Sequence, residues 1–444
     1  MAQKKQPRRG LFGRRRLSTE RVSPSGTAAQ PRNAKQSASS AEPGRRQTAR
    51  PKAKEFGAFR WQPRLDVSGA QNPIIQNMLR EFKRPFDQPM LLITIMLLVT
   101  GLIFILSASY PKGYYSTSES IGPMTYFFNQ LKSVMIGLVV MVLASAFDYR
   151  QYHMWGKVLY LISTLLLIAV PFLGTEYKGA KRWLFGFQPS ELAKISLILV
   201  VASMISMHPK RIRTIKGLLP YGVVLGVFIL LLVPEKHTSA MLILTMITVV
   251  MLTVGGMRLW YYIPVGVVGA IGAVVLYASM AHVRGRFAVW LHPFDYPLTG
   301  GWQACQSLIA VGSGGLTGLG IGQSRQKFLY LPEPMNDFIF AVVCEELGLI
   351  GAVLVILLFA YFIFRGFWIA CRAEDQMGCL LATGITTKFA VQTIINLCVV
   401  TGIFPVTGAS LPLFSYGGTA MILQLLEIGI LLNVSRHIPQ SKRE

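Results

Sequence analysis

Ten long apolar runs dominate this sequence and decide what the chain can fold into. An α-helix needs roughly 20 apolar residues to cross the hydrocarbon core of a bilayer, and several runs come close to that length. Of the 444 residues, 52% are hydrophobic and only 14% are charged, which excludes a soluble domain of this length. We therefore predict an all-α polytopic membrane protein with about ten transmembrane helices. The predicted spans are residues 90–109, 131–147, 158–172, 192–207, 218–233, 238–254, 263–278, 338–364, 379–400 and 420–434.

The positive charge of the chain is concentrated before the first span. The formal net charge is +24, and residues 1–84 hold 20 basic and 5 acidic residues. Because this stretch is rich in Arg, Pro, Ser and Gln, we predict a disordered cytoplasmic tail, followed by a transmembrane domain at 85–436 and a short tail at 437–444. The long tail either attracts anionic lipid or an acidic partner, or it only fixes the topology. Nothing in it predicts nucleic-acid binding.

Basic residues in the short loops set the orientation. They place both termini on the cytoplasmic side and the long connection 281–336, between spans seven and eight, on the extracellular side. The Trp and Phe content of this connection predicts that it folds back onto the membrane surface. Several basic residues remain outside against the rule, which predicts an anionic ligand there, with tolerance by short loops as the alternative. They are Lys178, Lys181, Arg182, Arg284, Arg286, Arg325 and Lys327.

Two carboxylates, Glu333 and Asp337, lie at the mouth of the eighth span. They belong to the stretch Leu-Pro-Glu-Pro-Met-Asn-Asp-Phe-Ile-Phe-Ala that leads into it. An ionisable group where the lipid ends suits the base of a membrane-embedded enzyme. An Asp directly before a helix also suits a helix N-cap. Upstream, the glycines of residues 318–322 predict close backbone approach to a bulky headgroup, with amide donors aimed at phosphate oxygens.

A second group of polar residues lies before the fourth span. The residues Pro-Ser-Glu, ending at Glu191, indicate a helix start, and Glu191 and Lys194 lie three residues apart on one helical face. The pattern is typical of a capped helix with one ion pair, and it also suits the entry of a polar cavity. Lys181 and Arg182 offer positive charge to a diphosphate, Arg through forked hydrogen bonds.

Two further features lie near the C-terminus. The segment 402–418 is punctuated by Gly and Pro, and such broken backbone is tolerated at membrane depth where it lines protein or a wet cavity. Lys388 lies in the middle of span nine, so we expect it to pair with Glu427 or with one of Glu345 and Glu346; a water-filled cavity is the alternative. The Cys and His residues show no metal-ligand spacing, so they predict no metal site.

These segments together resemble the SEDS family, the shape, elongation, division and sporulation proteins of the bacterial cell wall. The run Gly-Gln-Ser-Arg-Gln-Lys-Phe-Leu-Tyr-Leu-Pro-Glu-Pro, at 322–334, is more similar to the division and sporulation branches than to the elongation branch. One departure is Pro-Glu-Lys-His-Thr-Ser at 234–239, where the family usually has a Pro-Asp-x-Gly-Thr-like sequence. The role of this loop is therefore open.

The resemblance implies a peptidoglycan glycosyltransferase that polymerises lipid II at the outer face of the cytoplasmic membrane, in septal cell-wall synthesis during division. Asp337 would be its general base, with a class B penicillin-binding protein and division proteins as partners and a divalent cation left open. A lipid II flippase or transporter and a non-catalytic scaffold of the division machinery are the alternatives. The residues expected to contact substrate are Lys181, Arg182, Gln188, Ser190, Glu191, Lys194, Arg286, Gln306, Ser313, Arg325, Lys327, Glu333 and Ser415.

Overall fold

The structure is a computed structural model that describes residue 81 and residues 84–116, 122–177, 180–279, 281–297 and 300–439. All of these lie within one compact unit, Glu55–Glu444. Almost all of the predicted tail 1–84 lies outside the described residues, as do Lys178 and the end of the second tail.

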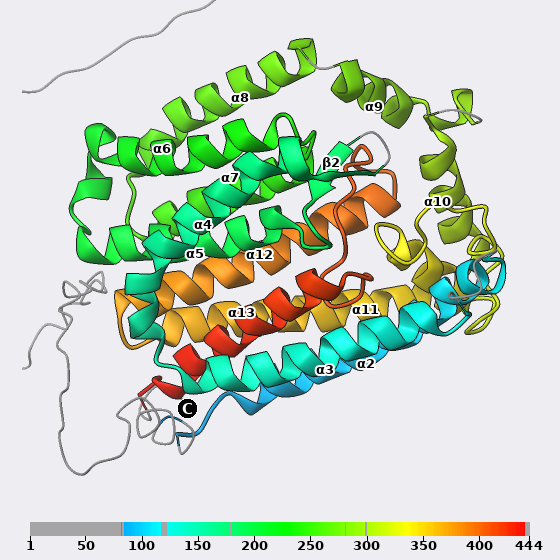
Figure 1. Cartoon of the computed structure of the whole chain (residues 1–444), viewed down its shortest axis with the longest axis horizontal. Coiled ribbons are helices and arrows are strands. Elements are labelled where there is room, and N and C mark those ends of the chain that lie inside the picture. The colour runs from blue at the N-terminus through cyan, green and yellow to red at the C-terminus, as the bar shows by residue number, and fades with distance from the viewer. Residues whose placement is uncertain are drawn as a thin grey trace, which may run out of the picture. The chain divides into compact units, whose positions relative to one another are not determined.

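Helices make up almost all of the described chain (Figure 1). Two short strands, β1 (Thr175–Tyr177) and β2 (Ala180–Trp183), form an antiparallel hairpin in which Glu176 pairs with Lys181. The α-helices are α2 (Gln88–Tyr114), α3 (Thr125–Ala146), α4 (Tyr152–Leu173), α5 (Pro189–Met207), α6 (Ile215–Leu232), α7 (Thr238–Val254), α8 (Tyr262–Ser279), α9 (Ala281–Leu291), α10 (Trp302–Ser313), α11 (Ile339–Arg372), α12 (Gln376–Val400) and α13 (Gly418–Arg436). Short 3-10 turns occur at Tyr149–Gln151, Arg211–Arg213, Leu259–Tyr261 and Pro293–Asp295.

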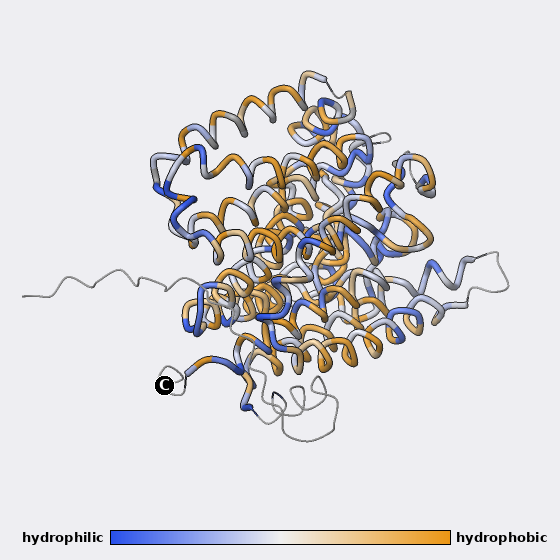
Figure 2. Tube along the Cα trace, turned by 60° about the vertical axis from the view of Figure 1, so that its left-hand side comes forward, coloured by the Kyte–Doolittle hydropathy of each residue, from blue (hydrophilic) through white to orange (hydrophobic). Residues whose placement is uncertain are grey.

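The prediction of an all-α polytopic membrane protein is confirmed. In the described part of the chain, nine helices are long and apolar enough to cross a membrane, and the shorter apolar helix α7 coincides with the remaining predicted span. Figure 2 shows hydrophobic residues along the outward sides of these helices, as expected for surfaces that face lipid.

Helix α12 is enclosed by the other helices because its sequence is too polar to face lipid. Its apolar window has a mean hydropathy of 1.3, and 89% of that window is buried. Thr386, Lys388 and Asn396 are among the polar side chains that it buries. Helix α8 differs: its window has a mean hydropathy of 1.8 and none of it is buried, and the helix lies at the edge of the bundle (Figure 1).

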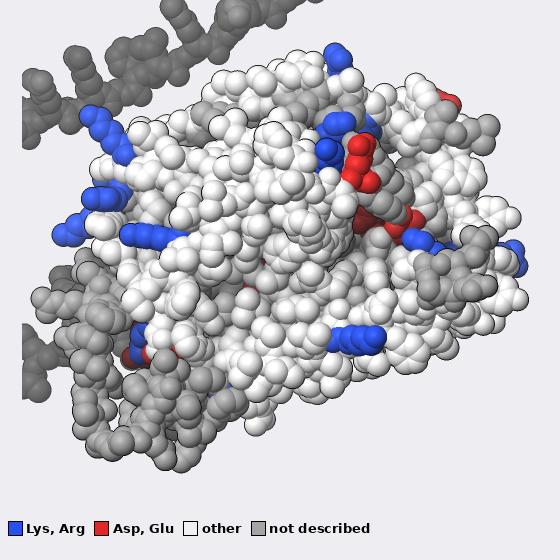
Figure 3. Space-filling view, viewed as in Figure 1, with Lys and Arg blue, Asp and Glu red and all other residues white. Residues whose placement is uncertain are grey.

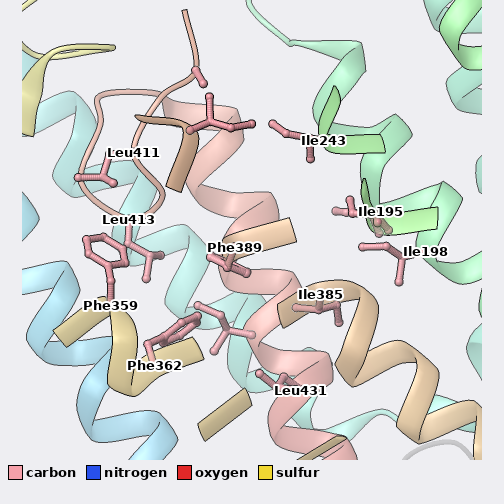
Figure 4. Close-up of a cluster of buried hydrophobic side chains, with 14 of the residues drawn as sticks. Ile195, Ile198, Ile243, Phe359, Phe362, Ile385, Phe389, Leu411, Leu413 and Leu431 are labelled. Carbon is pink, nitrogen blue, oxygen red and sulfur yellow. The ribbon is translucent and has the colours of Figure 1, made fainter. Parts of the chain in front are cut away.

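Large apolar side chains close the core around α12. Phe362 of α11 packs edge-on against Phe389 of α12, with ring centroids 5.1 Å apart, and Phe359 lies 5.2 Å from Phe414. Figure 4 shows Leu411 and Leu413 beside Phe359 in the same cluster. The segment 402–418 is therefore packed onto the core, which fixes the path of its backbone.

Helix α11 is broken at Gly348, whose φ of +66° and ψ of −166° are not helical. The Gly-rich loop, residues 318–322, supplies hydrogen bonds at the break. The amides of Leu319 and Gly320 donate to the carbonyls of Glu345 and Glu346, respectively, each at 3.0 Å. Our prediction that amides of this loop are aimed at phosphate oxygens is wrong for these two residues, because the protein itself uses them. The loop is thereby fastened to α11.

The connection 281–336 contains α9 and α10 and is more structured than a loop. The indole nitrogen of Trp290 donates to the carbonyl of Gly402 at 2.9 Å, and that of Trp302 donates to the carbonyl of Tyr330 at 2.8 Å. Its aromatic residues therefore hold the connection to the segment 402–418 and to itself.

Candidate functional site

Asp337 is held in place by residues of two other segments. Asn396 of α12 donates from Nδ2 to the carbonyls of Asp337 and Ala409, both at 2.7 Å. Ser415 donates from Oγ to the carbonyl of Asn336 at 2.6 Å. The main-chain carbonyls of Asn336 and Asp337 are thus both held just before α11. This limits how far the Asp337 carboxylate can move.

Gly408 marks the place where Asp337 and Arg182 converge. A Cβ on Gly408 would lie 3.3 Å from Oδ2 of Asp337 and 3.9 Å from Nη1 of Arg182, and its φ of +74° favours glycine. Helix α11 begins at Ile339 with Phe338 in the cap position, so our prediction that Asp337 is the N-cap is wrong by one residue. The Asp337 carboxylate lies beside the backbone of Gly408.

Arg182 projects from β2 and is held by the turn that follows α6. Its Nε donates to the carbonyl of Glu235 at 3.2 Å, and its Nη2 donates to the carbonyl of Lys236 at 2.7 Å. Burial lowers the pKa of the Arg182 guanidinium, whereas Asp337, and Glu235 when it is ionised, raise it. Two of the three nitrogens therefore fix the side chain, while Nη1 lies toward Gly408.

The same turn carries two buried titratable side chains, Glu235 and His237. Both oxygens of Glu235 and Nδ1 of His237 have no hydrogen-bond partner among the described residues. Burial raises the pKa of Glu235 to about 8, although the positive charge of Arg182 opposes this shift. Burial, together with the charges of Arg182 and Lys194, lowers the pKa of His237 to about 3. Both side chains are therefore mostly uncharged at neutral pH.

A second guanidinium, Arg286 of α9, belongs to this group. Burial and the charge of Arg182 lower its pKa, whereas Asp337 raises it, and its buried Nη1 has no hydrogen-bond partner in the described chain. Figure 3 shows acidic and basic side chains together between β2 and α10, on a face that is otherwise mostly uncharged. Because buried polar atoms in proteins are nearly always hydrogen-bonded, we interpret this group as a site for a polar, anionic ligand.

Apolar side chains adjoin the charged group. Arg286 lines a small pocket together with Trp290, Leu308 and Phe404, which come from α9, α10 and the segment 402–418. A ligand with both an anionic and an apolar part would therefore find both kinds of surface here.

Four buried charged side chains, those of Glu191, Lys194, Lys388 and Glu427, form a ladder of ion pairs inside the bundle. Lys194 lies 2.6 Å from Oε1 of Glu191, which confirms the ion pair predicted from their spacing. Lys388 lies 2.7 Å from Oε1 and Oε2 of Glu427 and 3.6 Å from Oε2 of Glu191. Glu427 is therefore the partner of Lys388 among the acids that the sequence offered. Two ammonium groups and two carboxylates alternate, and all four are almost fully buried.

Lys327 also makes buried contacts. Its Nζ donates to Oε1 of Glu346 at 2.9 Å, to Oγ of Ser107 at 2.9 Å and to the carbonyl of Gly322 at 2.6 Å. Ser324 donates to Glu345. These bonds fasten the connection 281–336 to α2 and α11, and the structure does not bring Lys327 to Asp337.

The other residues predicted to contact substrate lie in varied surroundings. Lys181 donates to the carbonyl of Pro171 at 3.2 Å, and Glu333 accepts from Nδ2 of Asn336 at 2.6 Å. Exposure separates the remaining ones: Ser313 and Arg325 are exposed, Gln188 is half-buried, and Ser190 and Gln306 are buried. Their contacts with a substrate remain predictions.

Sequence reasoning missed Glu235, His237 and Gly408 as parts of this site. The signal for the first two was the departure at 234–239, since a charged, irregular turn between two apolar helices has to be accommodated. Gly408 was inside a segment singled out for its broken backbone, but its closeness to Asp337 arises only from the packing of distant segments.

The fold and the site define a class: polytopic membrane proteins whose helices enclose a carboxylate and guanidinium site at one end of the bundle. The chain belongs to the SEDS family, since the family model for FtsW, RodA and SpoVE, described as "Cell cycle protein", matches residues 88–440.

Curated relatives and solved structures agree with this assignment. The chain is 40% identical to stage V sporulation protein E of Bacillus subtilis, over 79% of this chain and 97% of the relative. It is 37% identical to the probable peptidoglycan glycosyltransferase FtsW of Trichlorobacter lovleyi, over 81% and 96%. The fold matches a chain of a peptidoglycan synthase complex with a TM-score of 0.66, at 24% identity over 80% of this chain and 99% of that one. It also matches RodA of Thermus thermophilus with a TM-score of 0.57, at 25% identity over 80% and 98%. The chain is thus placed in the FtsW and SpoVE branch of the family.

Proposed function

We propose that this protein is a peptidoglycan glycosyltransferase that polymerises lipid II at the outer face of the cytoplasmic membrane, in septal cell-wall synthesis. The observation that carries the proposal is the convergence of Asp337 and Arg182 at Gly408. A base and a cation at one point are what glycosyl transfer from a diphosphate requires. The relatives named as peptidoglycan glycosyltransferases support it.

In the proposed reaction, Asp337 takes the proton of the attacking sugar hydroxyl while that oxygen forms a bond to the anomeric carbon of a second lipid II molecule. The bond between this carbon and the diphosphate oxygen breaks, and the undecaprenyl diphosphate leaves with the electron pair. Nη1 of Arg182 and the guanidinium of Arg286 balance the negative charge that develops on the diphosphate. The apolar pocket beside Arg286 accepts part of the lipid.

The ends of the bundle support an orientation with both termini cytoplasmic. Arg436, near the end of the last helix, donates from Nη1 to the carbonyls of Glu81 at 2.8 Å and Arg84 at 2.7 Å. The two terminal regions therefore lie on one side of the membrane, whereas Asp337 lies at the opposite end of α11 from Arg372. Basic cytoplasmic loops then place Asp337 outside.

Cysteine labelling in intact cells tests this orientation. Gln323 is exposed on the outer connection, and Lys216 is exposed at the start of α6. A membrane-impermeant thiol reagent should label Gln323→Cys in intact cells and Lys216→Cys only after permeabilisation. The reverse pattern would contradict the orientation.

A class B penicillin-binding protein is the proposed partner, because a chain of a peptidoglycan synthase complex shares this fold and polymerised strands need crosslinking. Co-purification from membranes in mild detergent tests the pairing. Recovery of this chain without any transpeptidase, from cells that contain both, would contradict it.

Polymerisation of purified lipid II in detergent tests the proposed function. With no membrane to cross, a flippase or a scaffold produces no glycan, whereas a glycosyltransferase makes chains that can be resolved by gel electrophoresis. A well-folded sample that binds lipid II and yields no polymer, alone or with its transpeptidase, would overturn the proposal.

A further inference from the structure

The carboxyl group of Glu235 is placed unusually for a residue in contact with an arginine. Arg182 is bound by the main-chain carbonyls of Glu235 and Lys236, not by the carboxylate. The side chain of Glu235 is 1% exposed, and neither of its oxygens has a hydrogen-bond partner among the described residues. Lys236 has a φ of +52°, which lies in the left-handed region. At this turn the two successive carbonyls of Glu235 and Lys236 accept from one guanidinium.

Arg182 on β2 is the charged group that acts on Glu235 directly. Arg182 in turn lies near Asp337 before α11 and Arg286 on α9, and His237 on the same turn lies near the ion pair of Lys194 and Glu191 on α5. His237 on the same turn is neutral, because its pKa is lowered to about 3 by burial and by the nearby cations. Burial also raises the pKa of Glu235 to about 8, against the effect of Arg182. Glu235 is thus mostly uncharged at pH 7, and it ionises as the pH rises through about 8.

Ionisation of Glu235 changes what Arg182 can do. A buried carboxylate beside a guanidinium forms a charge-assisted hydrogen bond that is much stronger than a bond to a main-chain carbonyl. The guanidinium would then turn to donate to the Glu235 carboxylate, and Nη1 would no longer lie toward Gly408 and Asp337. A neutral Glu235 leaves this nitrogen to an anionic substrate.

We propose that Glu235 is a positioning residue for glycosyl transfer: its uncharged carboxyl group allows Arg182 to face Asp337 and a substrate phosphate, and its ionisation draws Arg182 away. The inference rests on the proposed function and assigns a role to the turn 234–239, whose role the sequence left open. No covalent step is involved, and the proton released on ionisation goes to solvent.

The pH dependence of polymerisation tests the proposal. For each purified variant, the rate at pH 9 is divided by its own rate at pH 7, under conditions where kcat and KM are both obtained. For the wild type we expect a fall of about tenfold, because the protonated fraction of a group with a pKa near 8 falls by that factor over this interval. Glu235→Gln cannot ionise, so its ratio should stay near one.

Glu81→Gln is the matched control, since Glu81 is also a buried glutamate but lies beside Arg84 and His437 at the other end of the bundle. Its ratio should fall as in the wild type. The same fall in Glu235→Gln would overturn the proposal while leaving the proposed function intact. If the wild type makes no glycan at either pH, the proposed function itself fails.

An infrared titration gives a readout that does not depend on activity. The carbonyl band of a protonated carboxylic acid should be present in the wild type at pH 7, lost by pH 9 and absent from Glu235→Gln at both values. If the wild-type and Glu235→Gln spectra at pH 7 show the same carboxylic acid bands, Glu235 is not protonated and the proposal is overturned, whatever the activity of the variant.

Discussion

Two groups of buried charges in this protein are built in opposite ways. In the ladder of Glu191, Lys194, Lys388 and Glu427, every charged group lies within 4 Å of a group of opposite sign, and the ladder carries no net charge. Around Asp337 and Arg182, charged and polar groups gather as well, but buried atoms of Glu235, His237 and Arg286 have no partner in the described chain.

The difference separates stability from function. Taking a charge out of water is costly, and a complete set of opposite partners offsets much of that cost. Every charged group of the ladder has a partner of opposite sign, so replacing one of its members should weaken the fold. Near Asp337, the buried atoms of Glu235, His237 and Arg286 lack this compensation within the described chain, which is typical of a site organised for a ligand. Mutations in the two groups should therefore affect different measurements.

The largest effect on stability is expected for Lys388→Met. Loss of the ammonium leaves Glu427 buried without the ion pair that it makes in the described part of the chain, and breaking such a buried pair costs about 3–5 kcal/mol. Thermal unfolding in detergent and accumulation in membranes should both fall sharply. The double variant Lys388→Met with Glu427→Gln should recover much of the loss, because no uncompensated charge remains. A harmless Lys388→Met would remove the contrast between the two groups.

Arg182 should show the opposite behaviour. Arg182→Ala removes the cation that faces Asp337, and we expect polymerisation to fall by about 10²-fold, as for the loss of one electrostatic donor in other enzymes. Arg182→Lys keeps the charge but cannot hold two carbonyls while presenting a third nitrogen, so it should retain only about a tenth of the activity. The measurement is the initial rate with lipid II. Near-normal rates in both variants would leave Arg182 with a structural role.

Gly408→Ala should have a smaller effect on both measurements. The left-handed φ costs about 1 kcal/mol for alanine, and the new Cβ would lie 3.3 Å from Oδ2 of Asp337. We expect a small loss of stability and a clear loss of rate. Gly256→Ala is the control, because Gly256 also has a positive φ, of +101°, but a Cβ there meets nothing within 4 Å. Equal rates for the two variants would show that Gly408 does not shape the site.

The sequence predicted those parts of the molecule that depend on local composition. The spans follow from apolar runs, and the partner of Lys388 follows because an ammonium in the middle of a span has few acids to choose from. The role of the Leu319 and Gly320 amides was predicted wrongly, since only the break at Gly348 creates the carbonyls that these amides satisfy. The role of Glu235 was out of reach for the same reason: it depends on a contact with Arg182, which lies more than fifty residues away.

The most direct test of the account measures rate and stability together on Asp337→Asn. Asparagine keeps the shape of the side chain but cannot accept a proton at neutral pH, so polymerisation should fall by about 10²–10⁴-fold. The thermal unfolding midpoint of the same sample should stay close to that of the wild type, and Glu333→Gln should lose less activity. Near-normal polymerisation by folded Asp337→Asn, or an unfolding midpoint lowered as far as that of Lys388→Met, would contradict the assignment of Asp337 as the base.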